Sequence, residues 1–180
     1  MQELQKDIIT EMKSGSIIIY PTDTIYGIGC NALLDDKVKK IYLIKKRSES
    51  MPLSVIAPSF GWIKDNCKAD MAVVKKYLPG PYTLILKKKD PCFLKSASSG
   101  KDTIGVRIIK HPIMAYFRKA DIPFITTSVN VSGKEPICDI SKIPKDMSAL
   151  VDIAIDCGII CGKPSKVVDL SGTEKTVIRQ

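Results

Sequence analysis

The sequence predicts an α/β protein with a mixed sheet, and the order of its elements carries this prediction. Short β-branched and aromatic runs alternate with segments in which apolar residues recur at helical spacing. The last three strand-like runs follow one another with no helical segment between them, so the sheet is not purely parallel. Apolar residues make up 44% of the 180-residue chain, which is enough for a sizeable core. We therefore expect a single domain over residues 1–180.

The first third of the chain is expected to form two helices and two strands. An amphipathic helix is predicted over residues 2–14, where apolar side chains recur every three or four positions. The run Ile17–Tyr20 predicts a strand buried on both faces, and Pro21 ends it because proline has no N–H to give to a sheet. A second helix is expected over residues 35–47, with basic residues in its last turn that suit the helix dipole. The apolar run Leu53–Ala57 predicts the second strand.

The middle of the chain continues this alternation. Residues 59–78 carry apolar and basic residues at helical period and are expected to be helical up to the Pro-Gly-Pro that follows. The runs Tyr82–Leu86 and Thr103–Ile108 predict two strands. Residues 87–101 between them are rich in lysine and serine and predict an exposed, mobile loop. The segment Pro112–Lys119 predicts a short helix that proline opens.

The last third is expected to be rich in strands. The run Phe124–Thr127 predicts a strand that continues into the polar segment Ser128–Gly133. Residues 138–150 are expected to be irregular or weakly helical. Three further strands are predicted at Ile153–Ile155, Val167–Leu170 and Thr176–Ile178.

Polar side chains recur where the predicted strands end or begin. Thr22, Asp23 and Thr24 follow the first strand, and polar groups at such a place in an open α/β sheet face the crevice where ligands bind. A turn explains these residues equally well, because Thr and Asp often hydrogen-bond to the backbone after a strand. The residues alone leave both interpretations open. Other polar residues beside predicted strands are Lys45, Arg47, Arg107, Ser128, Asn130, Ser165 and Arg179.

Arg107 stands among the apolar residues of a predicted strand. A buried guanidinium needs a carboxylate or phosphate partner, because an unpaired charge in the interior costs much free energy. A salt bridge within the protein and a bound anion both satisfy this need. The position of Arg107 therefore predicts an anionic partner, which is either a carboxylate of the protein or a bound anion.

The charge of the chain favours an anionic partner. Lys and Arg number 28 against 19 for Asp and Glu, which gives a net charge of +9 at pH 7. Such a surplus suits association with nucleotides or RNA, although net charge speaks to association more than to function.

Cysteine and histidine do not indicate a metal site. The six cysteines include no C-x-x-C pair and His111 is the single histidine, so we expect no protein-bound zinc. The cysteines are expected to be reduced and to act as small apolar residues, as in a cytosolic protein. The chain begins without the basic and apolar regions of a secretory signal, and no apolar run approaches the ~20 residues of a membrane span. We therefore expect a cytoplasmic protein without a membrane partner.

Six blocks of residues, in order along most of the chain, resemble the YrdC-like family of threonylcarbamoyl-AMP synthases. The blocks are P-T-D-T-I-Y-G at 21–27, K-K-R at 45–47 with P-L at 52–53, P-G-P-Y-T at 79–83, T-I-G-V-R at 103–107, T-S-V-N-V-S-G at 127–133, and S-K-V-V-D-L from 165 with I-R at 178–179. The resemblance implies a twisted, mixed open sheet of about seven strands with flanking helices around a deep, positively charged cavity. It also implies the short form of the family, without the C-terminal extension domain of longer members.

The same resemblance implies an enzyme. Members of the family are nucleotidyltransferases that join L-threonine, bicarbonate and ATP to give threonylcarbamoyl-adenylate and pyrophosphate. The product would serve the threonylcarbamoyladenosine modification of tRNA through a downstream threonylcarbamoyl transferase complex. Mg²⁺ is the implied cofactor and would arrive with ATP, held by phosphate oxygens and water rather than by protein side chains. A tRNA or double-stranded RNA is a further implied partner.

Two sets of binding residues follow from the resemblance, position by position. L-Threonine would be bound by Thr24, Arg107, Ser128 and Ser165. ATP would be bound by Lys45, Arg47, Thr103, Asn130 and Arg179. No step demands a protein nucleophile, so Lys45, Arg47 and Arg107 would act by positioning and by electrostatics.

Two other functions remain alternatives at this stage. A non-catalytic module that binds double-stranded RNA or tRNA would use the same basic character, although the chain lacks an aromatic-rich RNA-binding signature. The related carbamoyl-transfer domain of hydrogenase maturation belongs to far longer chains that carry zinc fingers, which this chain lacks.

Overall fold

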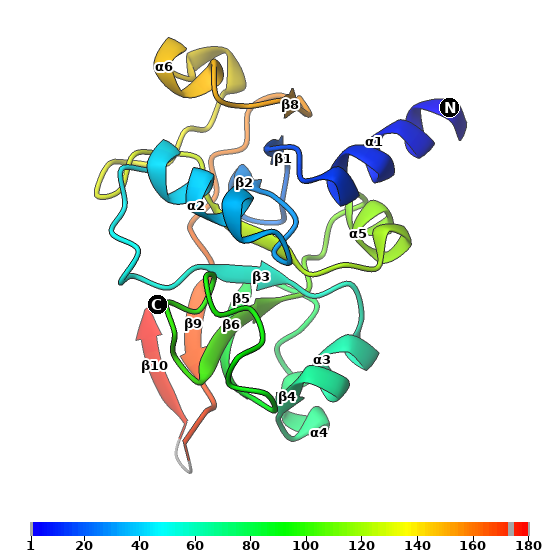
Figure 1. Cartoon of the computed structure of the whole chain (residues 1–180), viewed down its shortest axis with the longest axis vertical. Helices are drawn as coiled ribbons and strands as arrows, with labels where there is room; N and C mark the ends of the chain where they lie inside the picture. The colour runs from blue at the N-terminus through cyan, green and yellow to red at the C-terminus, as the bar shows by residue number, and fades with distance from the viewer. Residues whose placement is uncertain (1, 173–174, 180) are drawn as a thin grey trace.

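The structure, a computed structural model, describes residues 2–172 and 175–179 and has one mixed sheet with helices around it (Figure 1). The helices are α1 (Gln2–Ser14), α2 (Asp35–Ile44), α3 (Phe60–Asn66), α4 (Met71–Val74), α5 (Met114–Ala120), the 3₁₀-helix η1 (Ile140–Lys142) and α6 (Lys145–Ser148). The strands are β1 (Ile18–Tyr20), β2 (Gly27–Gly29), β3 (Ser54–Ile56), β4 (Cys67–Lys68), β5 (Tyr82–Lys88), β6 (Thr103–Arg107), β7 (Phe124–Ser128), β8 (Ile153–Ala154), β9 (Lys166–Asp169) and β10 (Thr176–Arg179). The predicted α/β class and mixed sheet are confirmed.

The sheet has ten strands within the described residues, rather than about seven. Their order is β10-β9-β5-β6-β3-β7-β2-β1-β8, and β4 pairs separately with β5. The central strand β3 pairs parallel with β6 and antiparallel with β7, and β9 pairs parallel with β5. Segments that are far apart in the sequence are thus neighbours in the middle of the sheet.

The sequence does not predict β2, because two of its three residues are glycine, which is depleted in strands. These glycines are required by close packing. A Cβ on Gly29 would lie 1.7 Å from the carbonyl oxygen of Ile125, and one on Gly27 would lie 2.9 Å from the ring of Tyr20. β2 pairs antiparallel with β1 and with β7, so tertiary contacts make a strand of residues that local propensity assigns to a turn.

Residues 59–78 form two helices instead of the continuous helical segment predicted. The side chain of Ser59 accepts a hydrogen bond from the N–H of Trp62 and caps α3, and Asp70 caps α4 through the N–H of Ala72. Between the two helices, β4 pairs with the end of β5. The caps at Ser59 and Asp70 and the pairing of β4 with β5 therefore divide this segment into two helices, although its apolar residues recur at helical spacing.

The segment 87–101, predicted to be an exposed, mobile loop, is exposed at most positions but buried at several others. β5 extends to Lys88, whose side chain is buried. Its ammonium donates to the carbonyl oxygens of Pro91 at 2.7 Å and Phe93 at 2.8 Å, and to Oγ of Ser98 at 2.9 Å. Since an ammonium has three donors, all of them are used, and the following turns are built around this group.

The helices α1 and α5 pack beside each other on the sheet next to β1 (Figure 1). The rings of Tyr20, Phe117 and Phe124 meet edge to face there, with centroids 5.2 to 5.9 Å apart, which adds to the apolar core. The hydroxyl of Tyr20 donates to the carbonyl oxygen of Ile125 at 3.1 Å. Among the described residues, no helix has the length and apolar character needed to cross a membrane.

Replacement of Lys88 by methionine is expected to lower the free energy of unfolding by about 2–3 kcal/mol, because two carbonyl oxygens and a hydroxyl lose their buried donor. Lys89→Met, at the exposed neighbour, is the matched control and should change it by less than about 0.5 kcal/mol. Urea denaturation of the two variants measures the difference. Equal stabilities would show that the ammonium does not organise the segment.

Candidate functional site

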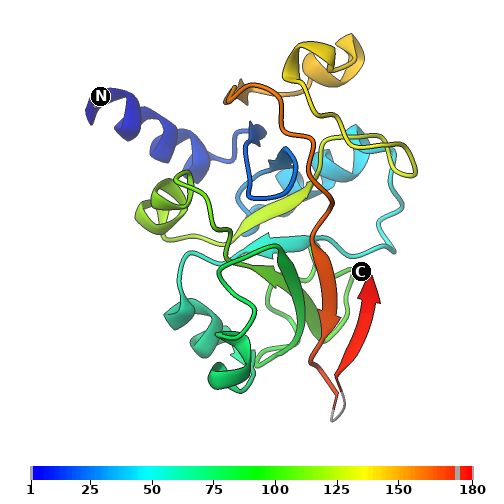
Figure 2. The ribbon, with the colours of Figure 1, turned by 180° about the vertical axis from the view of Figure 1, so that it is seen from behind.

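A cavity of about 710 Å³ opens on the sheet, a size within the range of small-molecule sites. Its walls come from β5, β6, β7, β9 and β10, together with the segments that follow β1, precede β3 and follow β7. Figure 2 shows β9 running beside β5 and β10 beside β9, so these two C-terminal strands form one side of the hollow. Distant segments of the chain therefore share one cavity.

Arg107 ends β6 and lies in the cavity wall with its side chain 8% exposed. Its Nη2 donates to Oδ1 of Asp23 at 2.9 Å and to Oγ1 of Thr24 at 3.2 Å. Burial lowers the pKa of the Arg107 guanidinium, and the Asp23 carboxylate partly offsets this by raising it. Of the two partners left open by the sequence, the structure supplies the internal carboxylate.

The segment after β1 that contains Thr22 and Thr24 forms a turn, and Thr22 also lies in the cavity wall. Oγ1 of Thr22 accepts from the N–H groups of Thr24 and Ile25 and donates to the carbonyl oxygen of Ile25 at 2.6 Å. It also lies 2.9 Å from Oγ1 of Thr24, which in turn contacts Arg107. The turn interpretation is confirmed, and the same turn holds Thr22 beside the cavity.

After α2 ends, the side chains of Lys45 and Arg47 point in different directions. Lys46 has a left-handed backbone (φ 48°), and the N–H of Arg47 bonds to the carbonyl oxygen of Tyr42 at 3.0 Å. Lys45 consequently points into the interior, whereas Arg47 reaches the cavity wall. Arg47 donates to the carbonyl oxygens of Met51 and Pro52, which fixes the approach to β3.

Lys45 is buried behind the cavity rather than in its wall. Its Nζ lies 2.5 Å from the carbonyl oxygen of Ser128, and 2.9 Å from both the carbonyl oxygen and Oδ1 of Asn130. Oγ of Ser128 donates to the same Oδ1 at 2.5 Å. Burial, and to a smaller extent the nearby charge of Arg47, lower the pKa of Lys45 to about 7. Lys45 thus shapes the end of β7, which does face the cavity.

The C-terminal hairpin brings Ser165 and Arg179 to the opposite wall. Oγ of Ser165 lies 2.8 Å from Oγ1 of Thr83. Arg179 donates from Nε and Nη2 to the carbonyl oxygen of Ser165, at 2.9 and 2.5 Å. The charge of Arg179 is one of the causes that lower the pKa of Arg107, so the two guanidinium groups act on each other electrostatically.

Seven of the nine predicted site residues lie in the cavity wall: Arg47, Thr103, Arg107, Ser128, Asn130, Ser165 and Arg179. The other two, Thr24 and Lys45, stand directly behind wall residues and hydrogen-bond to them. The structure also places Lys101 and Lys134 in the wall, two lysines that the sequence analysis did not single out. No local signal distinguishes them from the other lysines, because only the fold decides which lysines border a cavity.

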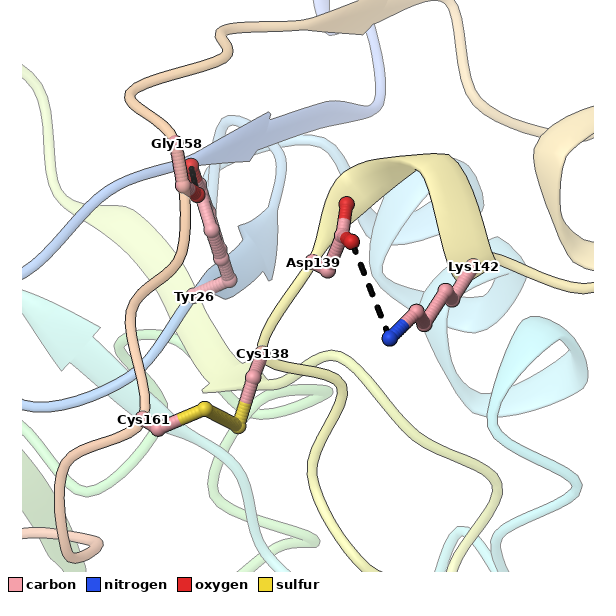
Figure 3. The surroundings of a disulfide bond; sticks show 6 residues. All are labelled: Tyr26, Cys138, Asp139, Lys142, Gly158 and Cys161. Carbon is pink, nitrogen blue, oxygen red and sulfur yellow. Dashed lines mark hydrogen bonds and ion pairs between the residues drawn. A yellow bond between two sulfur atoms is a disulfide. The ribbon is translucent and has the colours of Figure 1, made fainter.

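The expectation that all cysteines are reduced is wrong for one pair. Cys138 and Cys161 form a disulfide across 23 residues of sequence, as Figure 3 shows. Cys30 and Cys67 are buried free thiols, and burial raises the pKa of Cys30 to about 12 and that of Cys67 to about 11. The described residues contain no cluster of three or more metal-ligating side chains of the His, Cys, Asp or Glu type.

Fold and cavity together define an α/β protein whose mixed sheet holds a basic, hydroxyl-lined hollow suited to small anionic ligands. Comparison with family models narrows this class. The chain belongs to the Sua5/YciO/YrdC family, whose model, described as "Telomere recombination", matches residues 10–180. The family resemblance predicted from the six sequence blocks is confirmed.

Three similar proteins illustrate the family. The chain is 35% identical to a protein of Methanocaldococcus jannaschii, covering 100% of this chain and 84% of that one. It is 29% identical to the threonylcarbamoyl-AMP synthase of Bacillus subtilis, covering 93% of this chain and 47% of that protein. Pyrococcus abyssi Sua5, solved in complex with L-threonine, superimposes with a TM-score of 0.88 at 27% identity and covers 99% of this chain and 54% of that one. The chain thus spans about half the length of the last two proteins.

The free energy of unfolding is expected to depend on pH through the lowered pKa of Lys45. The pKa of Lys45 is about 7 in the folded protein, against 10.5 for an unburied lysine, so the unfolded state binds more protons between these values. The free energy of unfolding therefore gains a contribution from Lys45 as the pH rises from about 7 to about 10, at most about 1.4 kcal/mol per pH unit.

Urea denaturation across this range measures the effect, with Lys45→Met as the variant that lacks it. The difference in free energy of unfolding between wild type and Lys45→Met should shift in favour of the wild type as the pH rises. Lys39→Met, at an exposed lysine of the same helix, is the control and should show no such trend. A difference for Lys45→Met that does not vary with pH would contradict the lowered pKa.

Proposed function

We propose that the chain is an L-threonylcarbamoyladenylate synthase, which joins L-threonine, bicarbonate and ATP to give threonylcarbamoyl-AMP, pyrophosphate and water. The observation that carries this proposal is one cavity that holds hydroxyl groups and several cations together. Arg107 contacts the hydroxyl of Thr24, and the cations Arg47, Lys101 and Arg179 border the same hollow. Named synthases among the similar proteins support the assignment.

The proposed L-threonine subsite consists of Arg107, Ser128 and Ser165 in the cavity wall, with Thr24 acting from behind through Arg107. Arg107 is the group for the α-carboxylate, because guanidinium groups bind carboxylates through several donors. Its Nη2 is already used by Asp23 and Thr24, whereas its buried Nε has no hydrogen-bond partner in the described residues. A ligand oxygen at Nε would supply the missing acceptor. The L-threonine bound to Pyrococcus abyssi Sua5 supports an amino-acid subsite in this fold.

The proposed ATP subsite consists of Arg47, Thr103, Asn130 and Arg179, with Lys45 acting from behind. Arg47 and Arg179 each keep guanidinium donors beyond those given to carbonyl oxygens, and these would neutralise the phosphates. Lys45 would contribute through Asn130, whose Oδ1 it holds at 2.9 Å.

Mg²⁺ fits this site as the companion of ATP. The carboxylates in the described part of the cavity wall are Glu135 and Asp169, too few for an all-protein cage. Phosphate oxygens and water would therefore hold the ion. When bound, Mg²⁺ supplies charge neutralisation to the phosphates, while the residues of the chain bind and orient the reactants.

The chemistry needs positioning more than a reactive side chain. The amine of threonine attacks CO₂ or bicarbonate and gives a carbamate, and a carbamate oxygen then attacks the α-phosphorus of ATP while pyrophosphate leaves. Holding three reactants in line supplies much of the rate enhancement. Cations that face the α- and β-phosphates stabilise the charge that develops there.

The setting of this activity belongs to the same proposal. We place it in the cytoplasm, with the adenylate passed to a downstream threonylcarbamoyl transferase complex and finally to tRNA. A non-catalytic module for tRNA or double-stranded RNA is the competing function, because the surplus of lysine also suits a phosphate backbone. The two functions differ in whether ATP is consumed.

Product analysis decides between them. The protein is mixed with ATP, Mg²⁺, bicarbonate and labelled L-threonine, and the products are separated by chromatography. We expect pyrophosphate and a labelled adenylate only when threonine and bicarbonate are both present. RNA binding without any adenylate would favour the module instead.

Arg107→Lys is expected to weaken the apparent affinity for threonine by roughly one to two orders of magnitude, which corresponds to about 1.5–3 kcal/mol of charge-assisted hydrogen bonding. Lysine keeps the charge but loses the planar set of donors. Arg118→Lys, on the exposed face of α5, is the matched control and should leave threonine use unchanged. Steady-state kinetics with varied threonine measure both. Normal threonine use by Arg107→Lys would remove Arg107 from the subsite.

A further inference from the structure

Asp23 is a buried carboxylate that none of the binding roles above uses. Its side chain is 10% exposed, and that of its partner Arg107 is 8% exposed. Oδ1 of Asp23 accepts from Nη2 of Arg107 at 2.9 Å, and Oδ2 accepts from the backbone N–H of Lys110 at 3.0 Å. Asp23 therefore ties the side chain of Arg107 to the turn that follows β6.

This arrangement fixes the plane of the guanidinium. Nη2 has two hydrogens, and its two acceptors are Asp23 and Oγ1 of Thr24. Because the guanidinium is planar, two acceptors on one nitrogen also set the directions of the other two nitrogens. One of these, Nε, is buried without a partner in the described residues. Arg107 thus keeps an oriented donor for an acceptor that the described chain does not supply.

Stability alone does not account for this pair. Removing two charges from water cancels much of their mutual attraction, and a buried donor without a partner adds a further cost. Asp23 neutralises the charge of Arg107 itself, while Arg179 adds positive charge nearby. The pair therefore offers oriented donors, which suit the carboxylate of an amino acid.

We propose that Asp23 is the positioning residue of the amino-acid subsite, and that it holds Arg107 so that the free donors of the guanidinium meet the α-carboxylate. This inference rests on the proposed function. It adds a residue that does not touch the substrate and acts only through Arg107.

Asp23→Asn is the test, because the amide keeps the shape of the carboxylate and removes its charge. Threonine binding is measured by calorimetry and threonine use by kinetics. We expect the dissociation constant and the KM for threonine to rise about tenfold, while kcat and the KM for ATP change less than about twofold. In an Arg107→Lys background, Asp23→Asn should add less than a twofold further effect, because the group through which it acts is gone.

The control is Asp152→Asn, whose carboxylate likewise accepts a distant backbone N–H, that of Ile17 at 2.7 Å, and lies at β1 and β8. It should leave threonine binding unchanged. Asp23→Glu, which keeps the charge, should recover part of the affinity. Threonine binding by Asp23→Asn equal to that of the wild type overturns the inference, as does an undiminished effect in the Arg107→Lys background. A wild type that binds no threonine overturns the proposed function itself, which is a separate outcome.

A second inference rests on the disulfide between Cys138 and Cys161. Figure 3 shows that it joins the segment leading into η1 to the irregular segment between β8 and β9. The N–H of Ile160 also bonds to the carbonyl oxygen of Cys138 at 2.8 Å. Both segments border the cavity close by, at residues 133–136 and 164–165. The disulfide therefore connects two walls of the cavity.

The segment between β8 and β9 also lies against the proposed threonine subsite. Cys161 forms an isolated bridge with Ile25, and a Cβ on Gly162 would lie 2.0 Å from the carbonyl oxygen of Thr24. Upstream, the hydroxyl of Tyr26 donates to the carbonyl oxygen of Gly158 at 2.8 Å. The segment between β8 and β9 is held near its start by Tyr26 and at its end by β9. Between these two points, the disulfide is the covalent bond that keeps it in place.

We propose that this disulfide is a redox-sensitive tie that sets the affinity of the cavity for its amino-acid ligand. Cys161 is exposed and Cys138 is half-buried, so a dithiol can reach the bond. In the exchange, a thiolate of the dithiol attacks one sulfur, the S–S bond breaks, and a second attack releases both cysteines as thiols while the dithiol becomes a disulfide. Reduction then loosens the segment around Cys161, which leads into the wall residues Pro164 and Ser165. Only the fraction of molecules with the wall intact binds ligand at full affinity.

Thiol titration, hydrogen exchange and calorimetry test this tie. The unfolded, unreduced chain should show four free thiols of its six cysteines. After dithiothreitol, exchange of the N–H groups at residues 160–162 should rise, and the dissociation constant for L-threonine should increase about three- to tenfold. A Cys138→Ser/Cys161→Ser variant should not respond to dithiothreitol. Cys157→Ser, at an exposed free cysteine of the same segment, should respond as the wild type does.

Three outcomes overturn the second inference: six free thiols before reduction, unchanged exchange at residues 160–162 after it, or unchanged threonine affinity despite faster exchange. The first two measurements need no ligand. They therefore remain decisive even where the proposed function fails.

Discussion

The site depends on a guanidinium that is kept inside the protein. Arg107 ends a central strand, and a positive charge at such a depth persists only beside a carboxylate. Asp23 supplies it from the segment after β1, which joins the two halves of the sheet around one cavity. The turn made by Thr22 brings that carboxylate to the correct place. Fold and site therefore share one interaction.

Two lysines show a related way of using buried charge. Lys45 and Lys88 each donate three hydrogen bonds to oxygens, and in both cases most of these oxygens belong to the backbone. An ammonium surrounded in this way fixes the course of a loop without an acidic partner. Lys45 shapes the end of β7, and Lys88 shapes the segment that leads to Lys101 at the cavity. The basic composition of the chain thus serves the architecture as well as the binding of anions.

The cavity wall combines a rigid part with a part held by a few contacts. β5, β6 and β7 are paired strands with buried residues, whereas the segment between β8 and β9 has no regular structure and is attached through Tyr26, an isolated bridge and a disulfide. Local stability in proteins follows such differences in packing and hydrogen bonding. The irregular segment is thus attached by fewer regular hydrogen bonds than the paired strands.

The sequence by itself determined the α/β class, most strand and helix positions, and seven residues of the cavity wall, because these follow from hydrophobic period and from polar groups at strand ends. Only the tertiary structure decided that Gly27–Gly29 is a strand, that Lys45 and Lys88 are interior, and that Cys138 meets Cys161. Each of these features depends on a partner far away in the chain. Local patterns report what a residue prefers, whereas burial and pairing depend on which distant backbone comes to lie beside it.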